Sequence, residues 1–327
     1  MRLFARRCLF LFLIAVTAPA FSQQCLTGDD IDAGARSNLQ NTAQQFFRMS
    51  AAGDYAGLKN SSIPAVANNF GSIETAAAQN KENFEGAQAT VRSVYVLEAP
   101  GTAPYPRAEF FCGVYNSPDR TEIVLPKLDP GRYALVIEDA SGGKVPMTLT
   151  LVFKQIGLAW KLAGFYLRPK QIAGHNGQWY LAQARQFKSR GDSYAAWFYF
   201  LSAWDTVAPV DFMSTPELDK INEELQQSRP AELPSPSKPL LLAANGRTVN
   251  ITSMTADPQN NGLQLVVRYQ VPDITDVDSA RNQNLTVARA LISKYPGFRD
   301  AFTQIVAYAV DPQGRAFWSP LPTKDVR

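Results

Sequence analysis

The feature that most limits the possible folds is a series of short segments between residues 91 and 167 in which apolar and polar side chains alternate. A period of two residues is typical of β-strands that bury one face. Turn sequences such as Asp129-Pro130-Gly131 separate the segments, so neighbouring strands are expected to form antiparallel hairpins. The expected strands are residues 91–97, 108–115, 122–125, 133–138, 147–154 and 160–167.

Helical periodicity precedes these strands. Residues 36–52 place Leu39, Ala43, Phe46 and Phe47 near helical spacing, and Gly53 ends the pattern. A short helix at 56–58 and another at 72–88 are expected to follow. Helices first and a run of strands afterwards predict an α+β fold, in which the helices pack on a curved antiparallel sheet.

This order resembles the nuclear-transport-factor-2-like family, which has a cone-shaped α+β fold. The features that carry the resemblance are Gln44-Gln45-Phe46-Phe47 in the first helix, the following 53–58 segment, and Trp160 in the last strand. The resemblance covers roughly residues 34–168, and it implies a pocket between helices and bent sheet. That family contains enzymes, ligand binders and assembly modules, so the fold alone does not assign a function.

Residues 178–226 return to a helical period, and two of the expected helices resemble a tetratricopeptide repeat. The matching positions, small and aromatic residues around a Gly-Asp turn, are Tyr180, Ala184, Phe187, Gly191-Asp192, Ala196, Phe200 and Ala203. One copy is present, whereas a stable array needs about three. The segment is therefore either a peptide-binding repeat or a helical hairpin packed on the first domain.

The remaining sequence divides at a proline-rich stretch. Residues 229–239 contain four prolines in eleven positions, which predicts an extended, semi-rigid linker. Residues 240–327 combine strands with a helix near 277–294 and predict a small α+β domain. The expected division is 1–22, a signal peptide; 23–170, the cone-like domain; 176–228, the helical segment; 229–239, the linker; and 240–327, the C-terminal domain.

The first residues have the pattern of a secretory signal. A basic start with Arg2, Arg6 and Arg7 is followed by the apolar run 8–18 and by small residues suited to cleavage after Ser22. The apolar run is shorter than the roughly 20 residues of a spanning helix, and no other segment is long enough, so no membrane span is expected. The sequence predicts export, to a periplasm or to the outside of the cell.

Removal of this segment changes the cysteine count and the net charge. Of the three cysteines, Cys25 and Cys112 remain, and in an oxidising compartment they are expected either to pair as a disulfide or to be two buried thiols. The remaining chain has 29 basic and 29 acidic residues, once the three arginines of the signal are removed. A neutral chain without a basic stripe is not expected to bind nucleic acid.

Catalytic motifs are scarce. The sequence has no Gly-rich nucleotide loop and no Cys-x-x-Cys, and its one histidine, His175, lies in a small-residue connector. No cofactor and no metal site are therefore expected. Glu109 is the one candidate catalytic residue: it would either face the concave side of the cone, where burial raises a carboxyl pKa, or lie at the surface in a salt bridge with Arg107 or Arg120.

Aromatic residues are dense in 179–204, and a two-helix unit has no room to bury all of them in its own interface. Trp197, Phe198 and Tyr199 are consecutive, so they point in different directions around the helix. They either pack on the cone-like domain or form an exposed binding patch.

Taken together, these patterns favour an exported, non-catalytic binding or scaffolding protein, whose partner is another protein or a small apolar ligand. The alternative is an enzyme that uses carboxylate and tyrosine groups in the pocket of the cone-like domain.

Overall fold

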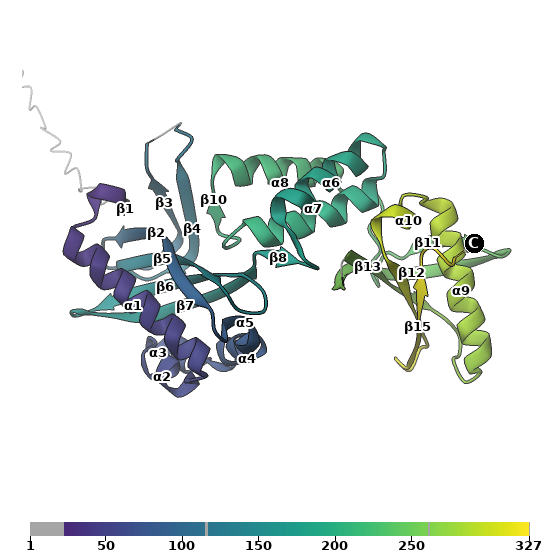
Figure 1. Ribbon diagram of the computed structural model, residues 1–327, viewed down its shortest axis with the longest axis horizontal. Helices are drawn as coiled ribbons and strands as arrows, with labels where there is room; N and C mark the ends of the chain where they lie inside the picture. Colours follow the sequence, from purple (N-terminus) through teal and green to yellow (C-terminus); the bar gives the residue numbers. More distant parts are fainter. Residues whose placement is uncertain (1–22, 115–116, 261, 327) are drawn as a thin grey trace, which may run out of the picture.

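A computed structural model describes residues 23–114, 117–260 and 262–326 (Figure 1). The α+β class expected from the sequence is confirmed. The expected signal segment 1–22 lies outside the described residues. Three parts follow one another along the chain: an N-terminal unit, a group of three helices, and a C-terminal unit with its own sheet.

The N-terminal unit begins with a short strand and a long helix. Helix α1 spans Ala33–Ala52; the side chain of Asp32 caps its start by accepting a hydrogen bond from the N–H of Ala35, and the left-handed Gly53 ends it. The single helix expected at 72–88 is two short helices, because the Asn80 side chain bonds back to the Ala76 carbonyl at 2.9 Å and ends the first. The remaining helices are η1 (Gly28–Asp30), α2 (Tyr55–Asn60), α3 (Pro64–Ala67), α4 (Gly71–Gln79) and α5 (Lys81–Phe84).

Five antiparallel strands form the main sheet of this unit, in the order β1-β2-β5-β6-β7. Both faces are buried. On one face, Phe46 and Phe47 of α1 pack against Phe153 and its neighbours; on the other, Leu97 and Leu135 pack against a second, three-stranded sheet, β10-β4-β3. The strands are β1 (Gln24–Thr27), β2 (Gln88–Ala99), β3 (Tyr105–Cys112), β4 (Thr121–Leu128), β5 (Gly131–Ser141), β6 (Met147–Ile156), β7 (Ala159–Pro169) and β10 (Met213–Ser214).

A small hairpin of β8 (Gln171–Ile172) and β9 (His175–Asn176) leads into three helices, α6 (Gly177–Ser189), α7 (Ser193–Val207) and α8 (Pro216–Ser228). Helices α6 and α7 approach closely where a glycine stands: a Cβ added at Gly177 would lie 2.3 Å from Cγ2 of Val207. Arg168 of β7 joins these helices to the first unit, because its guanidinium pairs with both Asp205 and Asp211 at 2.6 Å.

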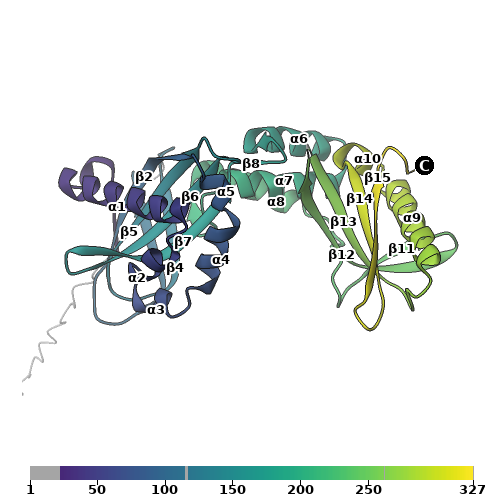
Figure 2. The ribbon, with the colours of Figure 1, turned by 60° about the horizontal axis from the view of Figure 1, so that its bottom comes forward.

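The C-terminal unit is a five-stranded sheet with strands in chain order, β11-β12-β13-β14-β15. Helix α9 connects β13 to its parallel neighbour β14 and packs on one face (Figure 2). On the other face, Arg268, Gln270 and Trp318 are exposed. The elements are β11 (Leu240–Ala244), β12 (Arg247–Gln259), β13 (Gly262–Gln270), α9 (Val277–Lys294), α10 (Phe298–Ala301), β14 (Gln304–Val310) and β15 (Ala316–Pro322).

Candidate functional site

The two cysteines that remain after the expected signal form a disulfide. Cys25 of β1 and Cys112 of β3 have Cα atoms 5.0 Å apart and are bonded through their sulfur atoms. The bond joins the main sheet to the second sheet that covers it. The disulfide alternative is therefore confirmed, and the two cysteines have a structural role.

Glu109 lies on the outer side of the second sheet. Its side chain is half-exposed and forms an ion pair with Arg107, which is one of the two arrangements that the sequence left open. The next residue on the same side of the strand, Phe111, is 54% exposed. This side of β3 therefore faces away from the interior, and Glu109 is not enclosed as a residue on the concave side of the cone would be.

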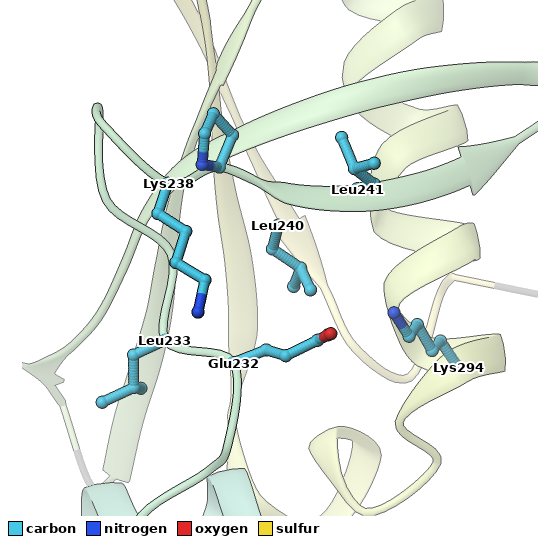
Figure 3. Close-up of a pocket in the computed structure, with 7 residues that line it drawn as sticks. Glu232, Leu233, Lys238, Leu240, Leu241 and Lys294 are labelled. Atoms are coloured by element: carbon cyan, nitrogen blue, oxygen red, sulfur yellow. The ribbon is translucent and has the colours of Figure 1, made fainter.

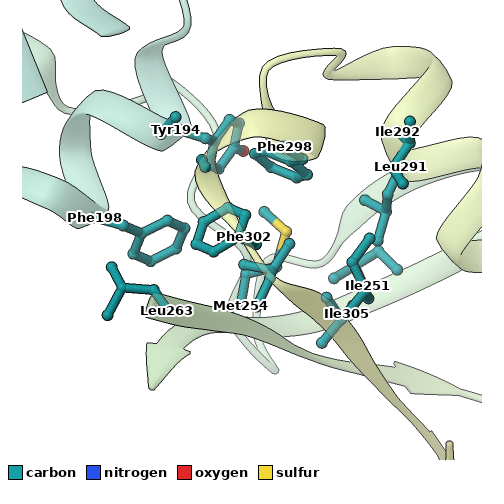
Figure 4. Packing of buried hydrophobic residues seen from close by; sticks show 14 of the residues in the cluster. Tyr194, Phe198, Ile251, Met254, Leu263, Leu291, Ile292, Phe298, Phe302 and Ile305 are labelled. Carbon is teal, nitrogen blue, oxygen red and sulfur yellow. The ribbon is translucent and has the colours of Figure 1, made fainter. Parts of the chain in front are cut away.

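Two of the three consecutive aromatic residues of α7, Phe198 and Tyr199, contact the C-terminal unit. Figure 4 shows Phe198 next to Phe302. Phe198 packs edge-on against Phe302, with ring centres 6.0 Å apart, and the Tyr199 hydroxyl donates a hydrogen bond to the Ala301 carbonyl at 2.7 Å. Trp197 is half-buried, with the Arg229 guanidinium 5.8 Å from its ring centre. Phe198 and Tyr199 are thus used inside the molecule, against the C-terminal unit, which neither of the two alternatives from the sequence had named.

A carboxyl group that the sequence analysis did not single out lies in the core of the N-terminal unit. Glu138 of β5 has 0% of its surface exposed, and its side chain points to the helix-covered face of the main sheet, as do Val136 and Ala140. A direct row across the sheet places it between Val91 of β2 and Leu149 of β6. Its surroundings on the sheet are therefore apolar.

Neither carboxyl oxygen of Glu138 has a hydrogen-bond partner among the described residues. Burial raises its pKa from the ordinary value of 4.5 to about 7, and the positive charge of Arg48 on α1 opposes the rise without overcoming it. Buried polar groups are nearly always paired, so an unpaired one calls for an explanation. A buried acid with a shifted pKa is also typical of functional sites.

An open pocket of about 340 Å³ lies beside the same face of the sheet, where Pro258 of β12 in the C-terminal unit also lines it. The row that holds Glu138 continues through Leu149 to Leu167 of β7, and Leu167 lines the pocket. Met147, a second lining residue, is a diagonal neighbour of Glu138, roughly 7–8 Å away at Cα. The other lining residues are Asn80, Asn83, Val145, Pro169, Gln171, Ile172 and Ala173.

The residue pattern along β5 does mark Glu138 as unusual. Alternation along β5 places Ala134, Val136, Glu138 and Ala140 on one face, so the acid interrupts an apolar series. The signal is weak in isolation, because the expected strand ended at residue 138 and its opposite face is equally apolar. Only the packing of α1 on this face shows that the carboxyl is enclosed.

Other candidate chemistry is limited. His175 is half-buried and stacks on Trp179, with ring centres 3.7 Å apart. Within the ranges that the structure describes, no group of three or more His, Cys, Asp or Glu residues is placed to hold a metal ion. The same ranges contain no helix with the length and apolar character needed to cross a membrane.

Comparison with known proteins gives no relative: no family model, no curated protein and no solved structure matches the chain.

Proposed function

We propose that this protein is an exported binding protein that holds a small molecule in its N-terminal unit, with Glu138 as the polar anchor. The observation that carries the proposal is the complete burial of Glu138, whose two carboxyl oxygens have no hydrogen-bond partner in the part of the chain that the structure describes. Such an arrangement destabilises the fold, and sites that reduce stability are commonly kept for function. The proposed pocket corresponds to the one implied by the resemblance to the cone-shaped family.

The neighbouring open pocket sets the chemistry of the ligand. Met147, Leu167 and Ile172 supply apolar contacts, and the side-chain amides of Asn80 and Asn83 supply polar ones. Met147 is flexible and unbranched, so its movement would extend the pocket toward Glu138. The ligand would then be a small molecule with an apolar body and a hydroxyl or amine that donates a hydrogen bond to the carboxyl.

Export and scaffolding complete the proposal. The Cys25–Cys112 disulfide supports an oxidising compartment. The tetratricopeptide-like helices would act as a spacer, since Arg168 ties them to the first unit and Phe198 and Tyr199 tie them to the second.

The test is native mass spectrometry of the protein purified gently from the compartment to which it is exported. Wild type is expected to carry a small bound mass, and the Glu138→Leu variant is expected to lose it. Thr150→Val is the matched control, because Thr150 is a buried polar residue on the opposite face of the same sheet. A bound mass that survives Glu138→Leu, or a wild-type protein with no bound mass, would contradict the proposal.

The second candidate is an enzyme that uses Glu138 as a general acid or base, and the pKa of about 7 favours it. The Glu138→Gln variant separates the two candidates, because the amide keeps the shape of the side chain but transfers no proton. An enzyme would accumulate unreacted substrate on Glu138→Gln, with a mass different from that bound to wild type. A binding protein would carry the same mass on both, or none on the variant.

A further inference from the structure

A second pocket lies in the C-terminal unit, at the start of the edge strand β11 (Figure 3). It has a volume of about 320 Å³. The loop that follows α8 supplies Glu232, Leu233, Lys238 and Pro239; β11 supplies Leu240 and Leu241; and α9 supplies its last residue, Lys294.

The loop beside this pocket is held in place by contacts with the rest of the molecule. The Tyr194 hydroxyl of α7 donates a hydrogen bond to the Glu232 carbonyl, and Leu233 packs against the core. Ser235 and Lys238 exchange two backbone hydrogen bonds of 3.1 Å. The backbone position of Lys238 is thereby fixed next to the strand.

Two positive charges point into the pocket. Figure 3 shows the side chains of Lys238, Glu232 and Lys294 reaching the same space from different sides. Neither lysine forms an ion pair with any residue in the described ranges. With one carboxylate and two ammonium groups, the pocket has a positive charge to offer to an anion.

The two edges of this sheet differ in a way that matters for pairing. Strand β15 carries Pro320 and Pro322, which lack the N–H needed to pair with another strand. Strand β11, with the sequence Leu-Leu-Leu-Ala-Ala, has no proline and no charged residue, and Leu241 is 62% exposed. No strand in the described part of the chain pairs with its outer edge. β11 is therefore the edge open to a further strand.

We propose that β11 binds the carboxyl-terminal segment of a partner protein as an added antiparallel strand. An antiparallel peptide beside β11 ends next to Leu240, because the two chains run in opposite directions. Its terminal carboxylate then reaches Lys238 and Lys294, and its last apolar side chain rests on Leu233 and Leu240. The unpaired edge of β11 and the positively charged pocket beside it thus favour the same ligand, an extended peptide with an apolar last residue and a free carboxylate.

The probe is a library of acetylated hexapeptides with free carboxyl ends, selected on the full chain and then measured individually by fluorescence polarisation. Peptides with apolar last residues are expected to be selected. Amidation of the end, or the change Lys238→Gln or Lys294→Gln, should each weaken binding about tenfold, as expected for loss of a charged hydrogen bond. Methylation of alternate peptide N–H groups should remove binding, because it prevents strand pairing.

Lys324→Gln is the matched control, because Lys324 is an exposed lysine near the opposite edge of the sheet, and it should leave the affinity unchanged. Three results would overturn the proposal: selection of no hexapeptide, equal binding of amidated and free peptides, or a wild-type dimer in sedimentation whose β11 edge is protected from deuterium exchange. The Glu138→Leu variant should bind the peptides as wild type does, so this inference fails or holds independently of the proposed function.

Discussion

The two five-stranded sheets of this protein differ in how many of their faces are buried. The N-terminal sheet is buried on both faces, and its strand β5 reads as an almost continuous apolar run, Tyr-Ala-Leu-Val-Ile from residue 133. The C-terminal sheet is covered on one face, and β13 alternates between buried and partly or fully exposed residues along its whole length. Strands buried on both faces lose alternation because both sets of side chains leave water.

Because of this difference, a polar residue on the exposed face of the C-terminal sheet is ordinary, whereas one inside either core needs a hydrogen-bond partner. On the open face of the second sheet, Arg268, Tyr308 and Trp318 form a stacked row across three strands, at the surface where polar and aromatic groups are common. In its core, Asn284 accepts a hydrogen bond from the Tyr269 hydroxyl at 2.8 Å and donates one to Ser319 at 2.9 Å. Glu138 of the first sheet has no such partners within the described ranges, so it is an exception among the buried polar groups of the two sheets.

The largest effect on stability is expected for the disulfide that joins the two sheets of the N-terminal unit. Replacement of both Cys25 and Cys112 by serine should lower the free energy of unfolding by about 4–5 kcal/mol, because the disulfide closes a long loop in the unfolded chain. Urea denaturation monitored by deuterium exchange measures this loss. The C-terminal core should keep its protection from deuterium exchange. An equal loss of protection in the N-terminal and C-terminal units would contradict the idea that the two five-stranded sheets are stabilised separately.

The Glu138→Leu substitution should have the opposite effect on the free energy of unfolding and stabilise the N-terminal unit. At pH 8, where the carboxyl is ionised, removal of the unpaired buried charge should raise the free energy of unfolding by about 3 kcal/mol. The measurement is thermal and urea unfolding of wild type and variant across a pH series.

The pH dependence of that gain follows from the direction of the pKa shift. The folded pKa, about 7, lies above the ordinary 4.5, so the folded state holds the proton more tightly. Wild type should therefore lose stability relative to Glu138→Leu as pH rises through this interval, and the gain should level off above it. A gain that does not change with pH would show that the carboxyl is not buried as described.

Removal of a paired core group in the second unit provides the contrast. Asn284→Ala should destabilise the C-terminal unit by about 1–3 kcal/mol, because the buried Tyr269 hydroxyl loses its acceptor. Asn250→Ala is the control, since its bond to Gln270 lies at the exposed face, and it should cost less than about 0.5 kcal/mol. Equal effects of the two changes would remove the distinction between buried and exposed faces.

The smallest effect is expected at the open face itself. Trp318→Ala should change the free energy of unfolding by less than about 0.5 kcal/mol, because the side chain is 55% exposed at the edge of the sheet. A destabilisation of several kcal/mol, measured by urea unfolding, would mean that this face is covered in solution.

Several features were predictable because they depend on neighbouring residues. Alternation in 91–167 predicted the strands, and the Gly-Asp turn predicted the helical pair that became α6 and α7. The lengths of the helices were less predictable. The helix expected at 72–88 is divided at Asn80, because its side chain donates a hydrogen bond to a backbone carbonyl of the helix. The proline-rich segment 229–239 was expected to be an extended, semi-rigid linker, and in the structure Leu233 of this segment packs against the core.

The sequence by itself determined the α+β class, the two cysteines available for pairing, and the strand and helix periods, because these follow from side-chain spacing and chemistry along the chain. Only the tertiary structure decided which faces are enclosed. Glu138 and Glu109 both lie in β-strands, yet one is surrounded by α1 and its sheet while the other lies at the surface beside Arg107. Enclosure depends on which distant segments pack together, and spacing within one strand does not contain that information.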